Sequence, residues 1–232
     1  MRIAVLGSGP VGRAIAGRLA GLGHQVVVGT RNPEVTASRS DVAAWLIETP
    51  GVFFATFAEA AGHAELVINA AGGAVSIEVL DQVGKANLTE KVLLDISNPL
   101  EPDSGMPPRL FVKDEDSLAE QIQRRFPGAR VVKSLNTLNN RLMIDPGTLG
   151  ETTSVFVSGN EDAAKRTVTM LLEQLGHRDV IDLGDLSTAR GAEMYVAFWV
   201  RVALALGTSD FNIKIVRSSV PTLAPSRGAD QT

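Results

Sequence analysis

Three glycines near the start of the chain have the spacing that binds the pyrophosphate of a dinucleotide. Gly7, Gly9 and Gly12 follow the pattern G-x-G-x-x-G, after the apolar run of residues 3–6 and before the helical periodicity of residues 11–19. The first glycine permits a tight turn, the second lets the backbone approach a phosphate, and the third lets the helix pack closely on the strand. Free N–H groups at the start of the helix then favour negative charge. The expected contacts are Gly7, Ser8, Gly9, Pro10, Val11 and Gly12.

The next predicted strand indicates which dinucleotide is bound. Residues 25–29 contain three valines, and Thr30, Arg31 and Asn32 follow them. An NAD enzyme usually has Asp or Glu here, to accept a hydrogen bond from the ribose 2′-hydroxyl. An arginine instead binds a 2′-phosphate through charge-assisted hydrogen bonds, and Thr30 can add a hydroxyl donor. The sequence therefore predicts NADP(H) as the cofactor, with Arg39 as a candidate second cation.

Small and amide side chains follow three later predicted strands. The segment 71–73 carries almost no side chain, so a flat ring can lie against its backbone. Asn98 and Asn136 each offer an amide, which suits a nicotinamide carboxamide or an acceptor ring, whereas the competing explanation is that they cap loops. In an open parallel sheet these strand ends meet at the ligand site. The expected cofactor contacts here are Ala70, Ala71, Gly72, Asn98, Pro99 and Asn136.

Few side chains are candidates for a general acid. His24 and His177 each follow a glycine that ends a predicted helix, so we expect them to be helix C-terminal cations, and His63 lies on the wrong edge of the sheet. Reduction of a ketone or imine normally needs a positioned proton donor. We therefore expect no catalytic side chain and a hydride acceptor, such as a flavin-like ring, that needs no protein acid. Other titratable residues near the site are assigned to packing or to a strand face: Tyr195, Lys133 and Asp95.

Strands and helices alternate along most of the chain. Further strands are predicted over residues 52–56, 65–70, 91–96 and 130–134, and helices over residues 57–62, 75–83 and 117–126. The Pro-rich segment 101–108 is predicted to be a long loop beside the site. This order is typical of an α/β protein with a Rossmann-like, doubly wound, mostly parallel sheet, and we expect the NADP-binding domain to cover residues 1–144.

The pattern changes beyond about residue 145. Strands are predicted over residues 153–158 and 178–183, and helices over residues 161–175, with Asn160 as the capping residue, and 187–206. We expect a small C-terminal α+β domain over residues 145–216 that contributes the acceptor cleft and dimer contacts. The Ser-, Pro- and Gly-containing tail of residues 217–232 is expected to be flexible.

Composition narrows the function classes. The 232 residues have a formal net charge of −4, so no basic footprint for nucleic acid is expected. Cysteine is absent, which excludes disulfides, thiolate nucleophiles and sulfur-ligated metal sites. The longest apolar stretch, residues 196–206, contains Arg201 and is too short to span a bilayer. The first predicted strand begins at the N-terminus, without a signal peptide, and we expect a cytoplasmic protein with a small-molecule partner.

The last predicted helix is apolar around most of its circumference. Met194, Phe198, Val202 and Leu206 form one stripe, and apolar residues also occupy most positions between them. A helix that covers only one surface shows a polar face to water. This helix is therefore expected to be buried twice, and a homodimer is the expected arrangement, with burial inside one chain as the alternative.

The chain resembles the NADPH-dependent reductases of coenzyme F420, a 5-deazaflavin; membrane ferric reductases carry a related domain. The matching segments are residues 2–12, 23–31, 131–137 and 185–190, and the resemblance extends to about residue 216. It implies that NADPH lies on the glycine turn, that Thr30 and Arg31 hold its 2′-phosphate, and that the deazaflavin stacks on the nicotinamide in a cleft next to the C-terminal part.

Three functions remain open at this point. The first is hydride transfer between NADP(H) and coenzyme F420, a flavin or a ferric chelate. The second is reduction of a small carbonyl or imine substrate in the 6-phosphogluconate-dehydrogenase-like group, whose members usually add a large helical domain for which residues beyond 150 leave no room. The third is NADP(H) sensing without catalysis.

Overall fold

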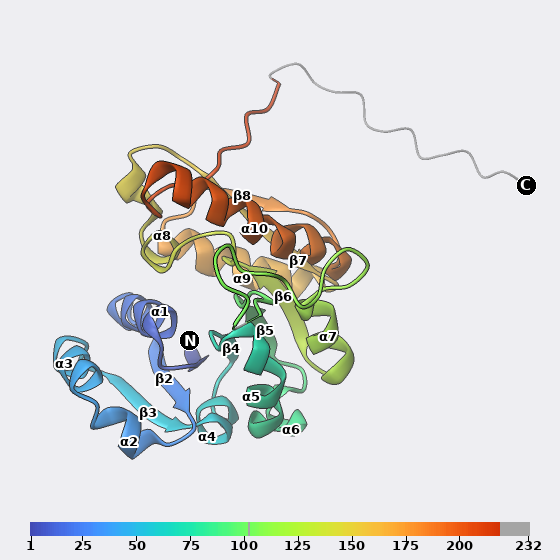
Figure 1. Cartoon of the computed structure of the whole chain (residues 1–232). Coiled ribbons are helices and arrows are strands. Elements are labelled where there is room, and N and C mark those ends of the chain that lie inside the picture. The colour runs from blue at the N-terminus through green and yellow to red at the C-terminus, as the bar shows by residue number, and fades with distance from the viewer. Residues whose placement is uncertain (102, 219–232) are drawn as a thin grey trace, which may run out of the picture.

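A computed structural model describes residues 1–101 and 103–218, and they build an eight-stranded sheet (Figure 1). The strand order is β3-β2-β1-β4-β5-β6-β7-β8, which places β1 and β4 side by side in the interior of the sheet. The chain adds β2 and β3 on one side of β1 and then continues with β4 on the other side of β1, so the strand order reverses at this point. The strands are β1 (Arg2–Leu6), β2 (Gln25–Thr30), β3 (Val52–Thr56), β4 (Leu66–Asn69), β5 (Val92–Asp95), β6 (Arg130–Ser134), β7 (Ser154–Gly159) and β8 (Asp179–Asp182).

The first six strands are parallel, and the direction changes only between β6 and β7. Lys133 of β6 pairs antiparallel with Ser158 of β7, and β7 then pairs in parallel with β8. The predicted Rossmann-like, mostly parallel sheet is confirmed. Residues beyond 145 do not start a separate sheet, because β7 and β8 extend the sheet of the N-terminal part. The division into domains at residue 144 stays a prediction.

Alternate residues of each strand point to opposite faces, and each face has its own core. In β1, Ile3 and Val5 pack with α1, α8 and α9, whereas Ala4 and Leu6 pack with α4, α5 and α7. Strands buried on both faces are the reason for the continuous apolar runs in the sequence. The helices are α1 (Pro10–Gly21), α2 (Pro33–Ala37), α3 (Ser40–Glu48), α4 (Phe57–Gly62), α5 (Ser76–Val83), α6 (Lys85–Leu88), α7 (Leu118–Arg125), α8 (Asn140–Ile144), α9 (Asp162–Leu175) and α10 (Ala189–Leu206), with 3₁₀ turns η1 (Gly73–Val75), η2 (Pro146–Leu149) and η3 (Leu186–Thr188).

Helices α2, α3, α6 and α8 have no counterpart among the predicted elements. They are short, and side-chain caps start two of them: Asn32 accepts from the Val35 N–H at 3.1 Å, and Asn139 accepts from the Leu142 N–H at 2.8 Å. The expected cap of α9 is wrong. Glu161 occupies the N-cap position, and Asn160 instead accepts a hydrogen bond from the Leu186 N–H at 3.0 Å, which joins the start of α9 to η3.

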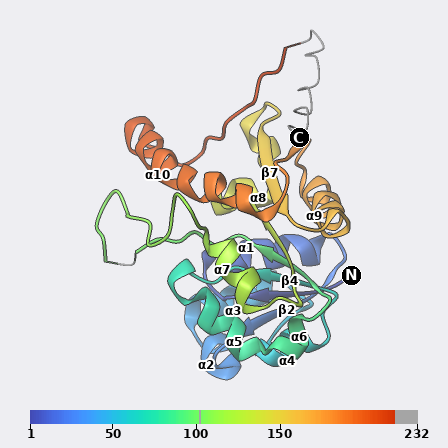
Figure 2. The same cartoon turned by 90° about the vertical axis from the view of Figure 1, so that its right-hand side faces the viewer.

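Helix α10 lies across the C-terminal half of the molecule and presents one buried and one exposed face (Figure 2). Val196 and Val200 are buried, whereas Phe198 and Leu206 of the expected stripe are exposed. The predicted loop before α7 is present, and its two ends are joined where Leu100 and Leu110 form a bridge. Of the tail predicted to be flexible, only Arg217 and Ser218 are among the described residues. No helix in the described part of the chain combines the length and the apolar character needed to cross a bilayer.

Candidate dinucleotide and acceptor site

The glycine turn between β1 and α1 is held by contacts that leave no room for side chains at two of its glycines. Gly7 has a φ of +121°, and a Cβ there would lie 2.8 Å from the Ala70 carbonyl oxygen. A Cβ at Gly12 would lie 2.0 Å from the Gly7 carbonyl oxygen. By contrast, a Cβ at Gly9 meets nothing within 4 Å. Gly7 and Gly12 are therefore required by packing, whereas Gly9 faces open space.

Helix α1 begins without a side-chain cap. Gly9 is the N-cap residue and Pro10, which lacks an N–H, follows it. The remaining N–H groups of the first turn have no partner within the helix and point toward the space beside Gly9. Backbone donors and the positive end of the helix dipole thus converge on one open position, which is the arrangement that binds a phosphate group.

At the end of β2, Arg31 is exposed and makes no ion pair or hydrogen bond with any residue in the described part of the chain. Thr30 is buried, and its hydroxyl shares a hydrogen bond of 2.9 Å with the Thr36 hydroxyl. Arg39, the candidate second cation, pairs with Asp41 at 3.2 Å, and Arg13 also pairs with Asp41 at 2.7 Å. The Arg13 hydrogen bond, with the attraction of Arg39, lowers the pKa of the Asp41 carboxyl. Of the three arginines near this strand end, Arg13 and Arg39 share a carboxylate partner, whereas Arg31 has none in the described part of the chain.

A cavity of about 670 Å³ continues from the glycine turn along the carboxyl ends of β4 and β5. Its volume lies in the range of small-molecule sites. It brings together seven of the predicted contacts, namely Gly9, Pro10, Val11, Ala70, Ala71, Gly72 and Asn98. It also includes Gly73 of the segment predicted to face a flat ring. The other lining residues were not among the predicted cofactor contacts: Ala74, Val75, Ile96, Ser97, Leu100, Leu138, Asn139, Asn140 and Met143. None of these described lining residues carries a charge.

Two of the predicted amides are joined to each other rather than pointing freely into the cavity. Asn136 donates to the Asn98 side-chain oxygen at 2.9 Å and to the Ala192 carbonyl oxygen at 2.8 Å, and Asn98 donates to the Asn136 carbonyl oxygen at 2.9 Å. Asn136 is buried and does not line the cavity. Leu135 before it has a φ of +61°, an uncommon conformation that turns the chain out of β6. Pro99 is also outside the cavity lining. Among the lining amides, that of Asn140 has no hydrogen bond within the described residues.

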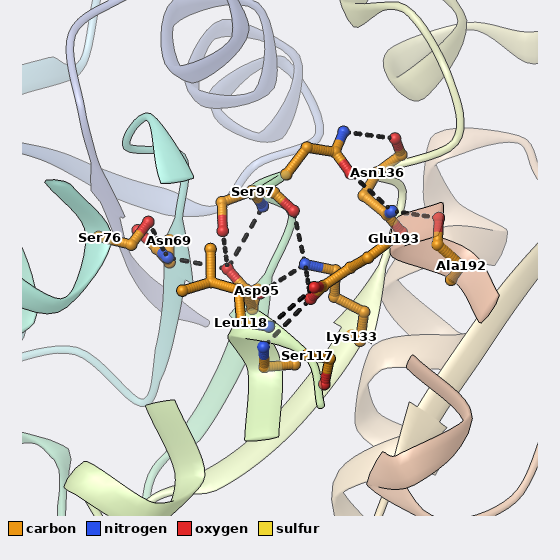
Figure 3. Close-up of polar contacts among 12 residues, drawn as sticks. Asn69, Ser76, Asp95, Ser97, Ser117, Leu118, Lys133, Asn136, Ala192 and Glu193 are labelled. Atoms are coloured by element: carbon orange, nitrogen blue, oxygen red, sulfur yellow. Dashed lines mark hydrogen bonds and ion pairs between the residues drawn. The ribbon is translucent and has the colours of Figure 1, made fainter. Parts of the chain in front are cut away.

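The cavity wall at Ser97 rests on a buried cluster of charged groups (Figure 3). The Lys133 ammonium lies 2.7 Å from an Asp95 oxygen and 2.9 Å from a Glu193 oxygen, and it donates to the Ser97 carbonyl oxygen. Burial alone would lower the pKa of Lys133, but the attraction of Asp95 and Glu193 outweighs burial and raises this pKa. Lys133 and Asp95, which the sequence analysis assigned to a strand face, are therefore members of a buried ion cluster.

The histidines and the tyrosine lie away from the cavity. His177 was expected to be a cation, and this is wrong: it is buried, it contacts the Met143 carbonyl oxygen at 3.1 Å, and burial lowers its pKa. A buried imidazole with a lowered pKa is neutral near pH 7. Tyr195 packs against Phe198, and burial raises the pKa of its hydroxyl. None of the three histidines contributes to the described cavity lining.

The fold and the site are those of a dinucleotide-binding protein of the Rossmann-like class. The defining features are the parallel sheet with its glycine turn, the open N-terminus of α1 and the cavity at the point where the strand order reverses. Residues 2–99 match the model of a family described as NADP oxidoreductase coenzyme F420-dependent. The chain is 30% identical to the F420-dependent NADP reductase of Methanothermobacter marburgensis, and the match covers 83% of this chain and 88% of the relative. The chain belongs to this family of NADP-dependent oxidoreductases.

Two further proteins are similar to this chain. An Arthrobacter sp. FB24 protein of known structure, assigned as an F420-dependent NADP-reductase, is 57% identical, with a TM-score of 0.91 over 94% of this chain and 100% of that chain. Rat metalloreductase STEAP3 is 30% identical over 89% of this chain. That match covers only 39% of the metalloreductase, so the chain spans well under half the length of this relative.

Gly9→Val is expected to abolish NADPH binding and leave the fold intact. The valine side chain enters the open space that a pyrophosphate needs, while no protein atom lies within 4 Å of its Cβ. Thermal unfolding should stay within about 2 °C of the parent, because the change is on the surface. Gly12→Val is the matched control, and it should destabilise the protein because its Cβ would overlap the Gly7 carbonyl oxygen. Normal NADPH affinity in folded Gly9→Val protein would show that the cofactor lies elsewhere.

Arg31→Ala is expected to weaken NADPH binding at least about tenfold and to leave NADH binding nearly unchanged, because one charge-assisted phosphate contact is lost. Titration of both cofactors by fluorescence or calorimetry measures this. Arg39→Ala removes the same charge from a side chain that Asp41 already engages, and it should change NADPH affinity less than about threefold. Equal weakening of NADPH and NADH by Arg31→Ala would contradict the assignment.

Proposed function

We propose that this protein transfers a hydride between NADP(H) and a deazaflavin, coenzyme F420, or a flavin-like ring. The observation that carries the proposal is the cavity that continues from the glycine turn and has no titratable side chain among its described lining residues. A dihydronicotinamide supplies the hydride when the cofactor is bound. The protein then needs only to hold two flat rings at near-attack distance, on the order of 3–3.5 Å.

The lining residues suit that task. Ala71 and Gly72 leave the backbone open to a flat ring, and apolar side chains such as Val75 and Leu138 exclude water from the contact. Asn140 has an unpaired amide that can bind a polar edge of either ring. The relatives named F420-dependent NADP reductases support coenzyme F420 as the first acceptor to test. The metalloreductase relative supports a ferric chelate as an alternative acceptor.

Reduction of a carbonyl or imine is less well supported, because it needs a proton donor within hydrogen-bond reach of the substrate. The described lining residues offer hydroxyl and amide groups only. Mixing NADPH with coenzyme F420, FMN or a ferric chelate tests the proposal directly. Turnover of F420 or FMN supports it, whereas tight NADPH binding without turnover of any acceptor favours a sensing protein.

Replacement of each histidine by glutamine should leave turnover within about threefold of the parent, because no histidine lines the cavity. Steady-state rates with the accepted ring measure this, with circular dichroism as the control for folding. A loss of about a hundredfold in any folded variant would identify a general acid and contradict direct hydride transfer.

We also propose that the protein is a homodimer in which a second copy covers the exposed face of α10. Phe198 and Leu206 on that face are each about 60% exposed. Leu204, exposed to the same extent, lines a groove beside that face together with Met106 of the loop before α7. Contiguous exposed apolar side chains of this kind mark interaction surfaces. Because the same stripe recurs on each copy, two α10 helices can cover each other around a twofold axis.

Light scattering at micromolar concentration is expected to give a mass near twice the 24.5 kDa of one chain. Phe198→Glu should shift the protein to monomer, because it buries a charge in the contact. Ile47→Glu is the matched control: Ile47 is exposed on α3, away from α10, and its replacement should leave the dimer intact. A parent protein that is strictly monomeric refutes the dimer.

A further inference from the structure

The charged cluster of Asp95, Lys133 and Glu193 lies behind the cavity wall and contacts the wall through Ser97. Ser97 lines the cavity, and its carbonyl oxygen accepts a hydrogen bond from Lys133 while its hydroxyl donates to Asp95 at 2.7 Å. The side chains of Lys133 and Asp95 are 0% exposed, and that of Glu193 is 2% exposed. Charges buried in this way are little screened by solvent or salt.

Each oxygen of the two carboxyl groups in this cluster accepts at least one hydrogen bond. One Asp95 oxygen accepts from Lys133, and the other accepts from the Asn69 amide at 2.8 Å and from the Ser97 hydroxyl. Glu193 accepts from Lys133 and from two backbone N–H groups at the start of α7, those of Leu118 at 2.8 Å and Ala119 at 3.1 Å. Every oxygen therefore faces donors, which are the partners that a carboxylate needs when it is buried.

The cluster consequently holds an excess negative charge. Two carboxylates oppose one ammonium, and Lys133 uses its three N–H groups on Asp95, Glu193 and the Ser97 carbonyl oxygen. The positive end of the α7 dipole offsets a part of this charge at Glu193. The Arg190–Glu120 pair also joins α10 to α7, at 2.7 Å, but it is partly exposed and makes no contact with the cavity wall.

We propose that this cluster biases the site toward the oxidised form of the nicotinamide. This inference rests on the proposed function and concerns the charge of the cofactor. When a neutral dihydronicotinamide ring gives up a hydride, which carries two electrons, the ring becomes a cation. A net negative charge buried behind the cavity wall attracts a cationic ring in the cavity, whereas a neutral ring has no net charge for it to attract. Asp95 and Glu193 therefore favour hydride donation from NADPH to the acceptor, and Lys133 holds both carboxylates in place.

The test is the ratio of the dissociation constants of NADP⁺ and NADPH, measured without any acceptor. Glu193→Gln and Asp95→Asn each remove one negative charge from a different element, and each should raise this ratio by at least about threefold. Glu193→Asp disturbs the packing and keeps the charge, so its ratio should stay within about twofold of the parent. Binding of 2′,5′-ADP, which lacks the nicotinamide, should be unchanged in all three variants.

Arg190→Gln is the matched control, since it breaks a partly exposed ion pair between the same two helices and should leave the ratio unchanged. The proposal is overturned if folded Glu193→Gln or Asp95→Asn protein keeps the parent ratio, or if Glu193→Asp changes it as strongly as Glu193→Gln. Failure of F420 as acceptor leaves this measurement unaffected, whereas a parent protein that binds neither nucleotide overturns this proposal and the proposed function together.

Discussion

Direct contact between backbone segments at the carboxyl edge of the sheet is the constraint on which the site depends. A Cβ at Gly12 would overlap the Gly7 carbonyl oxygen, and a Cβ at Gly73 would lie 1.9 Å from the Asn98 carbonyl oxygen. These contacts bring the ends of β1, β4 and β5 close together, and the part of the cavity lining at residues 70–74 consists of alanines and glycines alone. This part of the wall is little able to change its shape, because it has no rotatable side chains. A planar ring is the ligand that gains most from such a surface.

The site separates an uncharged surface from charged groups behind it. The described cavity lining has no ionised side chain, so a flat apolar ring does not remove water from a charged group there. The charges are one layer deeper, where Lys133 joins β5, β6 and α10. Asn136 makes a second connection from the wall to α10 through the Ala192 carbonyl oxygen. Two neighbouring residues of α10, Ala192 and Glu193, thus fix the position of this helix relative to the cavity wall.

The sequence was informative wherever the signal was local. Gly7, Gly9 and Gly12 have a fixed spacing between a strand and a helix, and the structure gives the first and third the expected close contacts. Arg31 was predicted in the same way, from its position after β2, and its role stays a prediction. The apolar runs predicted the parallel strands because both faces of the sheet are covered.

What the sequence did not reveal depends on contacts between distant residues. Asn136 was expected to be available to a ligand, but its amide is used by Asn98 and by Ala192, which lies 56 residues away. Glu193 was missed, although a signal exists: it is a charged residue on the buried face that Val196 and Val200 define. Lys133 and Asp95 gave the same signal, as opposite charges inside two apolar strands. Pairing such residues requires the strand order, which no local pattern contains.

The complete burial of Lys133 has a consequence for substitutions in this cluster. Removal of Lys133 alone leaves two buried carboxylates without their counter-charge, whereas joint replacement of the cluster by apolar residues of similar volume is often neutral. Positions 95, 133 and 193 lie on β5, β6 and α10, so the loss of one ammonium disturbs three separate elements. An apolar replacement of the cluster therefore requires matched changes in all three elements.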